Sequence, residues 1–183
     1  MTTAQFLDWE GDGHPGKQEL VHGVVRAMAP ASPAHGVLQA RIASRIETAL
    51  SKQKKACRVG TEVGVIPIWD PRHNVRVPDI SVTGTPPTPG ERTFPNPVLI
   101  VEILSPSNEK DTWESIQACA TIPSVSEIVV VSHDAVRISL FRKDSVGVWP
   151  EHPEVVERGG KVRLESIAAE FAIDDVFEGT GLV

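Results

Sequence analysis

The strongest constraint in the sequence is an apolar run, Val98 to Leu104, that a single charged residue, Glu102, interrupts. A short run that is apolar at nearly every position is typical of a strand buried on both faces at the centre of a sheet. A carboxylate in such a place is costly to bury unless something positive meets it. We therefore expect a cation beside Glu102, and a divalent metal ion shared with a second acid is the obvious candidate.

Asp79 is the second acid of this candidate site. It follows Pro78 in the segment from Val75 to Val82, whose β-branched residues predict another strand. Asp79 and Glu102 are far apart along the chain, so only pairing of their strands can bring them together. The Pro- and Gly-rich segment between the two strands is suited to such a connection.

The remaining signals predict both helices and strands. Ser32 followed by Pro33 is a start signal for a long amphipathic helix that runs to Lys52. Asp111 and Glu114 have the spacing of a capping box that opens a second helix. Further extended segments are expected at 19–28 (a hairpin), 57–67, 127–132, 136–143, 154–157 and 161–164. The pattern predicts a mixed α/β (α+β) fold, with a central mixed β-sheet flanked by helices and one domain over residues 1–183.

Composition limits the functions that the chain can perform. The net charge of −6 counts against tight non-specific binding of DNA, although it leaves room for a local groove. No apolar run approaches the roughly 20 residues that cross a bilayer, and the amino terminus lacks the features of a signal peptide. Cys57 and Cys119 stand apart from any CxxC or His cluster, which indicates neither a zinc site nor a disulfide framework. We expect a cytoplasmic protein with no membrane partner.

Several motifs occur in an order that resembles one family. They are VPDISV (77–82), NPVLIVEILSPSN (96–108) and IPSVSEIVVV (122–131), preceded by QELVHGVVRAMAPASPAHG (18–36). Together they resemble the Uma2-like family of restriction-type endonucleases, a branch of the PD-(D/E)XK nuclease superfamily, over most of the chain. The resemblance implies a restriction-endonuclease-like core and a DNA endonuclease that uses Mg²⁺ or Mn²⁺. A homodimer would place two such sites on the two strands of DNA.

The resemblance also implies a set of site residues. Asp79 and Glu102 would hold the metal, with the main-chain carbonyl of Ile103 as a further ligand. This agrees with the preference of Mg²⁺ for one or two carboxylates together with several waters. Glu19 matches an early glutamate of the family, and it either joins the metal site or is a hairpin acid paired with a basic neighbour. His35 either contacts the phosphate or the metal shell, or is a hydrogen-bonded structural imidazole.

The chain departs from the family at the motif lysine. Leu104 stands where the superfamily has it, and Ser115 stands where Uma2 relatives commonly have it. Lys110 and Gln117 are the candidate substitutes, the alternative being a solvated charge and an ordinary helix side chain. Two function classes therefore stay open. One is a metal-dependent endonuclease, and the other is a catalytically impaired nuclease-fold protein that acts as a nucleic-acid-binding or assembly module.

Overall fold

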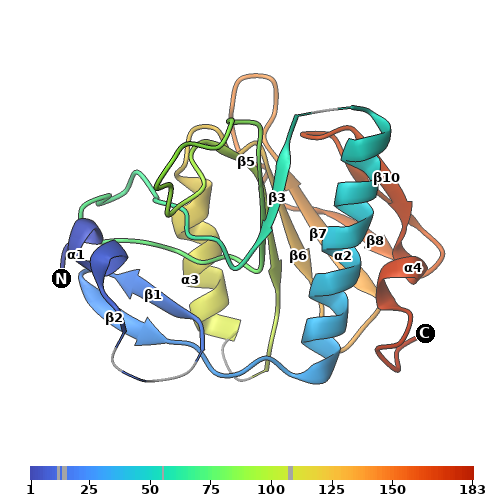
Figure 1. Cartoon of the computed structure of the whole chain (residues 1–183). Helices are drawn as coiled ribbons and strands as arrows, with labels where there is room; N and C mark the ends of the chain where they lie inside the picture. The colour runs from blue at the N-terminus through green and yellow to red at the C-terminus, as the bar shows by residue number, and fades with distance from the viewer. Residues whose placement is uncertain (12, 14–15, 55, 107–108) are drawn as a thin grey trace.

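A six-stranded mixed β-sheet lies at the centre of the computed structural model, which describes residues 1–11, 13, 16–54, 56–106 and 109–183 (Figure 1). Neighbouring strands are antiparallel except for one parallel pair, β5 with β6. The order across the sheet is β3 (Arg58–Thr61), β4 (Ile80–Thr83), β5 (Pro97–Ile103), β6 (Glu127–Val131), β7 (Arg137–Arg142) and β8 (Glu154–Glu157).

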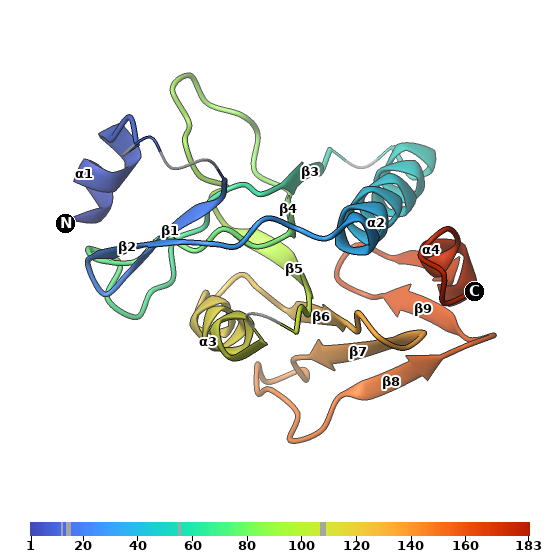
Figure 2. The same ribbon diagram turned by 90° about the horizontal axis from the view of Figure 1, so that it is seen from below.

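Helices cover both faces of this sheet (Figure 2). Helices α2 (Pro33–Lys52) and α4 (Ile173–Phe177) lie on one face, and α3 (Glu109–Ala120) lies on the other. Residues alternate along β5, so that Val101 packs in the core beneath α2 and Ile100 packs in the core beneath α3. The same alternation turns Glu102 toward α3. The predicted arrangement of a mixed sheet flanked by helices is confirmed.

Helix α2 begins and packs as its sequence indicates. The Ser32 side chain accepts a hydrogen bond from the backbone N–H of His35, and Pro33 occupies the first turn. The residues that α2 buries recur at helical spacing: Leu38, Ile42, Ile46 and Leu50. This cap fixes the start of the helix, and it thereby fixes the position of His35 at the end nearest the acids.

Smaller elements complete the chain. Helix α1 (Thr3–Asp8) precedes an antiparallel hairpin of β1 (Gln18–Val21) and β2 (Val24–Ala27). His22 and Gly23 both have positive φ at its turn, as a two-residue hairpin requires. The backbones of Leu20 and Val75 exchange two hydrogen bonds, which attach the hairpin beside the main sheet. A second hairpin, β9 (Lys161–Leu164) with β10 (Ala169–Ala172), precedes α4.

Three local predictions need correction. The strand expected at 75–82 is regular only from Ile80, because Val75 and Arg76 instead form isolated bridges with Leu20 and Val65. The strand expected at 57–67 stops at Thr61, and the next residue has a φ of 55°. The capping box was wrong. Helix α3 already begins at Glu109, and the carboxylates of Asp111 and Glu114 accept hydrogen bonds from Arg26 instead.

No helix among the described residues has both the length and the apolar character to cross a bilayer.

Candidate active site

Strand pairing brings Asp79 and Glu102 together. The antiparallel register pairs Ile80 with Val101, so Asp79, which immediately precedes β4, stands opposite Glu102, the residue that follows Val101 in β5. The backbone N–H of Asp79 lies 3.4 Å from Glu102 Oε2, and the N–H of Ile103 donates to Asp79 Oδ2 at 2.8 Å. Both acids are buried, with 4% and 3% of their surface exposed. The sequence located the two acids correctly in space, and their role as metal ligands stays a prediction.

Glu102 is a buried acid whose described contacts are all neutral. The Ser115 hydroxyl of α3 donates to Oε1 at 3.0 Å, and the Asp79 N–H faces Oε2. Burial, followed by the negative charge of Asp79, raises the pKa of Glu102 to about 8. Burial and the charge of Asp79 therefore favour the protonated form of Glu102 in the metal-free protein.

Asp79, in contrast, contacts a lysine and a histidine. Lys17 Nζ lies 3.1 Å from Oδ1, and His35 Nε2 lies 3.3 Å from the same oxygen. Burial opposes ionisation of Asp79, but the hydrogen bond from His35 and the charge of Lys17 outweigh it and lower the pKa of the carboxyl group. The pair is thus divided into a charged Asp79 and a mostly neutral Glu102.

Sequence reasoning missed Lys17, which arrives from the segment just before β1. Burial lowers the pKa of its ammonium group, but the carboxylates of Glu102, Asp79 and Glu19 outweigh this effect and raise it. A signal was present in the sequence, because Lys17 precedes Glu19 by two residues. In an extended segment, residues two apart face the same side. A prediction that places Glu19 at the site therefore implies Lys17 as well.

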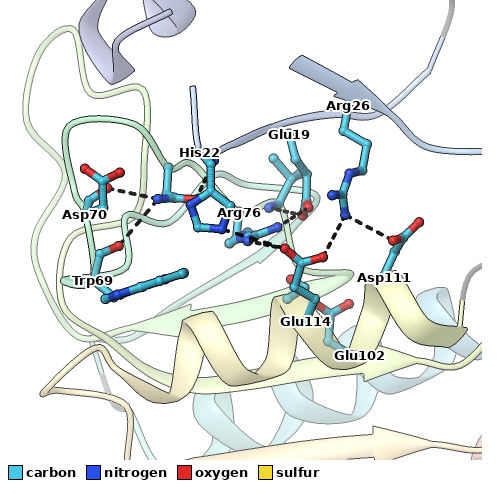
Figure 3. A network of polar contacts seen from close by, with 12 residues as sticks. Glu19, His22, Arg26, Trp69, Asp70, Arg76, Glu102, Asp111 and Glu114 are labelled. Atoms are coloured by element: carbon cyan, nitrogen blue, oxygen red, sulfur yellow. Dashed lines mark hydrogen bonds and ion pairs between the residues drawn. The ribbon is translucent and has the colours of Figure 1, made fainter. Parts of the chain in front are cut away.

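Glu19 is paired with a basic residue, Arg76, and it also lines the small cavity beside Asp79 and Glu102. Its role at a metal ion stays a prediction. Its Oε1 accepts a hydrogen bond from the backbone N–H of Val77 at 2.7 Å, and its Oε2 lies 3.4 Å from Nη1 of Arg76. Arg76 is fully buried, and its Nη2 lies 3.6 Å from Glu114 on α3 (Figure 3). Glu114 also accepts from Arg26 of β2. This network joins the β1–β2 hairpin to α3 and holds Glu19 beside the acid pair.

Two cavities meet at these residues. The smaller, of about 20 Å³, has room for an ion or a single water and is lined by Lys17, Glu19, Met28, His35, Asp79, Glu102, Ile103, Thr112 and Ser115. The larger, of about 290 Å³, is lined by Gly16, Lys17, Met28, Ala29, Pro30, Ala31, His35, Glu62, Asp79 and Ser105. Four residues line both, namely Lys17, Met28, His35 and Asp79. Asp79 can therefore be reached from the larger cavity, and Glu102 lines the small cavity next to it.

The structure does not bring every predicted residue to this place. Ile103, the last residue of β5, lines the small cavity. Lys110 and Gln117 are exposed on α3 and line neither cavity. Helix α3 instead presents Ser115 and Thr112 to the acids, because these residues lie on its buried face.

The chemistry of the site fits Mg²⁺ or Mn²⁺. Glu102 is a deeply buried carboxylate without a cationic contact among the described residues, and it lies directly opposite a second carboxylate. Mg²⁺ is commonly bound through one or two carboxylates, with waters completing its shell. Over the same described residues, no three His, Cys, Asp or Glu side chains are grouped as a metal cage. The donors that the site offers to an ion are thus the facing carboxyl groups of Asp79 and Glu102.

A mixed sheet flanked by helices, with two acids on neighbouring strands at the mouth of a cavity, defines the restriction-endonuclease-like class of fold. The chain belongs to the Uma2 family, whose model is described as "putative restriction endonuclease" and matches residues 3–174. A search of curated proteins found no match.

A solved structure shows the same fold. It is described as the crystal structure of a "putative nuclease belonging to DUF820" from Anabaena variabilis, and it is 21% identical to this chain with a TM-score of 0.75. The match covers 98% of this chain and 99% of the other. At this level of identity the likeness establishes the fold, while the activity has to be argued from the site.

Proposed function

We propose that the protein is a metal-dependent endonuclease that hydrolyses phosphodiester bonds of DNA with Mg²⁺ or Mn²⁺. The observation that carries the proposal is the buried Glu102 carboxyl group, which faces Asp79 and makes no ion pair among the described residues. The charge of Lys17 lowers the pKa of Glu102, but burial and Asp79 outweigh it. A cation would offset the cost of burying both acids as carboxylates. Membership of a family described as restriction endonucleases supports the same activity.

The residues would divide the work as follows. Asp79 and Glu102 would hold the ion, and Glu19, oriented by Arg76 and the Val77 N–H, would complete the acidic wall. A bound Mg²⁺ supplies an activated water and offsets negative charge on the phosphate. Because the acids repel a phosphate, the substrate has to approach through the larger cavity, where Lys17 and His35 present positive charge or hydrogen-bond donors.

A plasmid assay tests this proposal. We expect supercoiled DNA to be nicked in Mg²⁺ or Mn²⁺, with no cleavage in EDTA and none by the Glu102→Gln variant, which keeps the shape of the side chain but not its charge. Supercoiled DNA that turns directly into linear DNA indicates the homodimer that we predict, whereas nicked circles that appear first indicate one site acting at a time. Equal cleavage by wild type and Glu102→Gln contradicts the proposal.

A second candidate is a nuclease-fold protein that binds nucleic acid or assembles with partners without cutting. The observation that favours it is the pairing of Asp79 with Lys17 and His35, which already balances its charge without a metal. This candidate predicts no calorimetric signal for Mg²⁺ or Mn²⁺ and no cleavage in the plasmid assay. Metal-dependent cleavage of DNA that is lost in Glu102→Gln rejects it.

The affinity for Mg²⁺ is expected to increase with pH. Because the pKa of Glu102 is raised to about 8, the metal-free protein holds this proton at lower pH and has to release it when the ion binds. We expect the apparent affinity to rise by nearly tenfold per pH unit between pH 6 and 7.5 and to level off above pH 8.5. Calorimetry at pH 7 in two buffers with different ionisation enthalpies measures the proton released, which should approach one. An affinity that is constant from pH 6 to 9 contradicts this prediction.

A further inference from the structure

We propose that Lys17 is a catalytic residue that contacts a non-bridging oxygen of the scissile phosphate. The inference rests on the proposed function and deepens it. The ammonium group of Lys17 lies 3.1 Å from Asp79 Oδ1, and its side chain is only 13% exposed. A long cationic side chain in such a position is held by the site and does not simply extend into solvent.

The position of Lys17 between the two cavities supports this role. It lines the small cavity that contains Glu102 and Glu19, and it also lines the larger cavity through which Asp79 is reached. A phosphate that approaches Asp79 through the larger cavity therefore meets a wall that includes Lys17. Because the walls of the small cavity carry three acids, a fixed positive charge at the entrance is what a phosphate requires there.

The contact with Asp79 explains how the ammonium group becomes available. Lys17 and His35 both approach Oδ1 of Asp79, whereas Oδ2 accepts from the Ile103 backbone. A cation that binds Asp79 competes with Lys17 for the same carboxylate. The displaced ammonium group then lies beside the ion at the edge of the larger cavity, where it can contact a phosphate oxygen. Lys17 acts here as a charge, and no bond to it is made or broken.

The Lys17→Met variant tests the proposal. We expect the cleavage rate to fall by about 10²-fold or more, as when a preorganised donor to a transition-state oxygen is removed. The affinity for Mg²⁺ should be unchanged or higher, because Met does not compete for Asp79. Lys17→Arg should retain part of the rate. The matched control is Lys161→Met, which removes an exposed lysine of β9 paired with Glu170 and should leave the rate unchanged.

A rescue variant separates this role from a structural one. Ser115 faces the same small cavity from α3, with its hydroxyl 3.0 Å from Glu102 Oε1. A lysine at this position would supply a cation to the same cavity from α3. We expect Lys17→Met/Ser115→Lys to cleave at least tenfold faster than Lys17→Met, and Lys17→Met/Ser115→Met to cleave no faster than Lys17→Met. Thermal unfolding should confirm that each variant folds. If Lys17 only neutralises Asp79 in the absence of metal, Lys17→Met keeps the full rate and the proposal is overturned.

A measurement of DNA binding tests the contact between Lys17 and phosphate without relying on cleavage. Fluorescence anisotropy with a labelled DNA duplex in Ca²⁺ should show binding that Lys17→Met weakens several-fold while the affinity for Ca²⁺ is maintained. If the wild type cuts no DNA in any metal, the proposed function fails, yet this binding loss still supports a phosphate contact by Lys17. Equal DNA binding by wild type and Lys17→Met overturns the inference even in an active enzyme.

Discussion

The Asp79→Asn variant is expected to lose both metal binding and DNA cleavage while keeping its fold. In the wild type the Ile103 N–H donates to Asp79 Oδ2 at 2.8 Å. Asn preserves the shape of the side chain and has an oxygen that can accept the same hydrogen bond. It removes the negative charge that attracts the ion and that Lys17 and His35 now contact. Because a bound metal contributes several kcal/mol to the transition state, we expect cleavage to fall by about 10³-fold or more.

Calorimetry with Mg²⁺ and the plasmid assay measure the two losses. The matched control is Asp134→Asn, which makes the same chemical change in an exposed loop between β6 and β7. It should bind Mg²⁺ and cut DNA as the wild type does. Because Glu102 and Glu19 still provide negative charge near Lys17, thermal unfolding should place Asp79→Asn within a few degrees of the wild type. Undiminished Mg²⁺ affinity in Asp79→Asn rules out the acid pair as the metal site.

The central acids could be predicted from the sequence because their signals are local. A single charge inside an apolar run marks Glu102, and the observed strand, Pro97–Ile103, differs by one residue at each end from the predicted one. Ser32 and Pro33 likewise mark the start of α2 through a capping contact within three residues. In both cases the residues that determine the structure lie next to one another in the chain.

The spacing of Lys17 and Glu19 puts both on one side of an extended segment, but it does not say what that side faces. Their contacts with Asp79 and Arg76 depend on how the β1–β2 hairpin attaches to the sheet. Lys17 and Asp79 are 62 residues apart, and Glu19 and Arg76 are 57 apart. These contacts follow from the backbone bridge between Leu20 and Val75, which no local pattern specifies. The sequence therefore offered Lys110 and Gln117, which follow Glu102, as substitutes for the motif lysine. The ammonium group that contacts Asp79 instead belongs to Lys17, near the amino terminus.

The incorrect capping box has the same cause. Asp111 and Glu114 have the spacing of a local cap, but their carboxylates bind Arg26 at 3.1 and 3.0 Å. Arg26 belongs to β2, so the same docking of the hairpin that positions Lys17 also recruits these two acids (Figure 3). A tertiary ion pair has replaced a local hydrogen bond.

The Arg76→Met variant is expected to have the largest effect on stability. Arg76 is fully buried and lies between Glu19 and Glu114, so Met leaves Glu19 buried without its cation. Removing one partner of a buried ion pair costs about 3–5 kcal/mol. For a chain of this size we expect the melting temperature to fall by roughly 10 °C, measured by circular dichroism. The matched control is Arg137→Met, which breaks an exposed pair with Glu157 and should cost less than about 1 kcal/mol.

The double variant Glu19→Gln/Arg76→Met separates the lost charge pair from lost packing. If the cost comes from an uncompensated Glu19, removing its charge should restore a large part of the stability, and the two substitutions should be clearly non-additive. Mg²⁺ provides a second readout, because a cation at Asp79 and Glu102 also lies near Glu19, which lines the same small cavity. Mg²⁺ should therefore raise the melting temperature of Arg76→Met by more than it raises that of the wild type. An equal rise in both proteins would show that Glu19 does not sense the ion, and Glu19 would then be an acid that only holds the hairpin to Arg76.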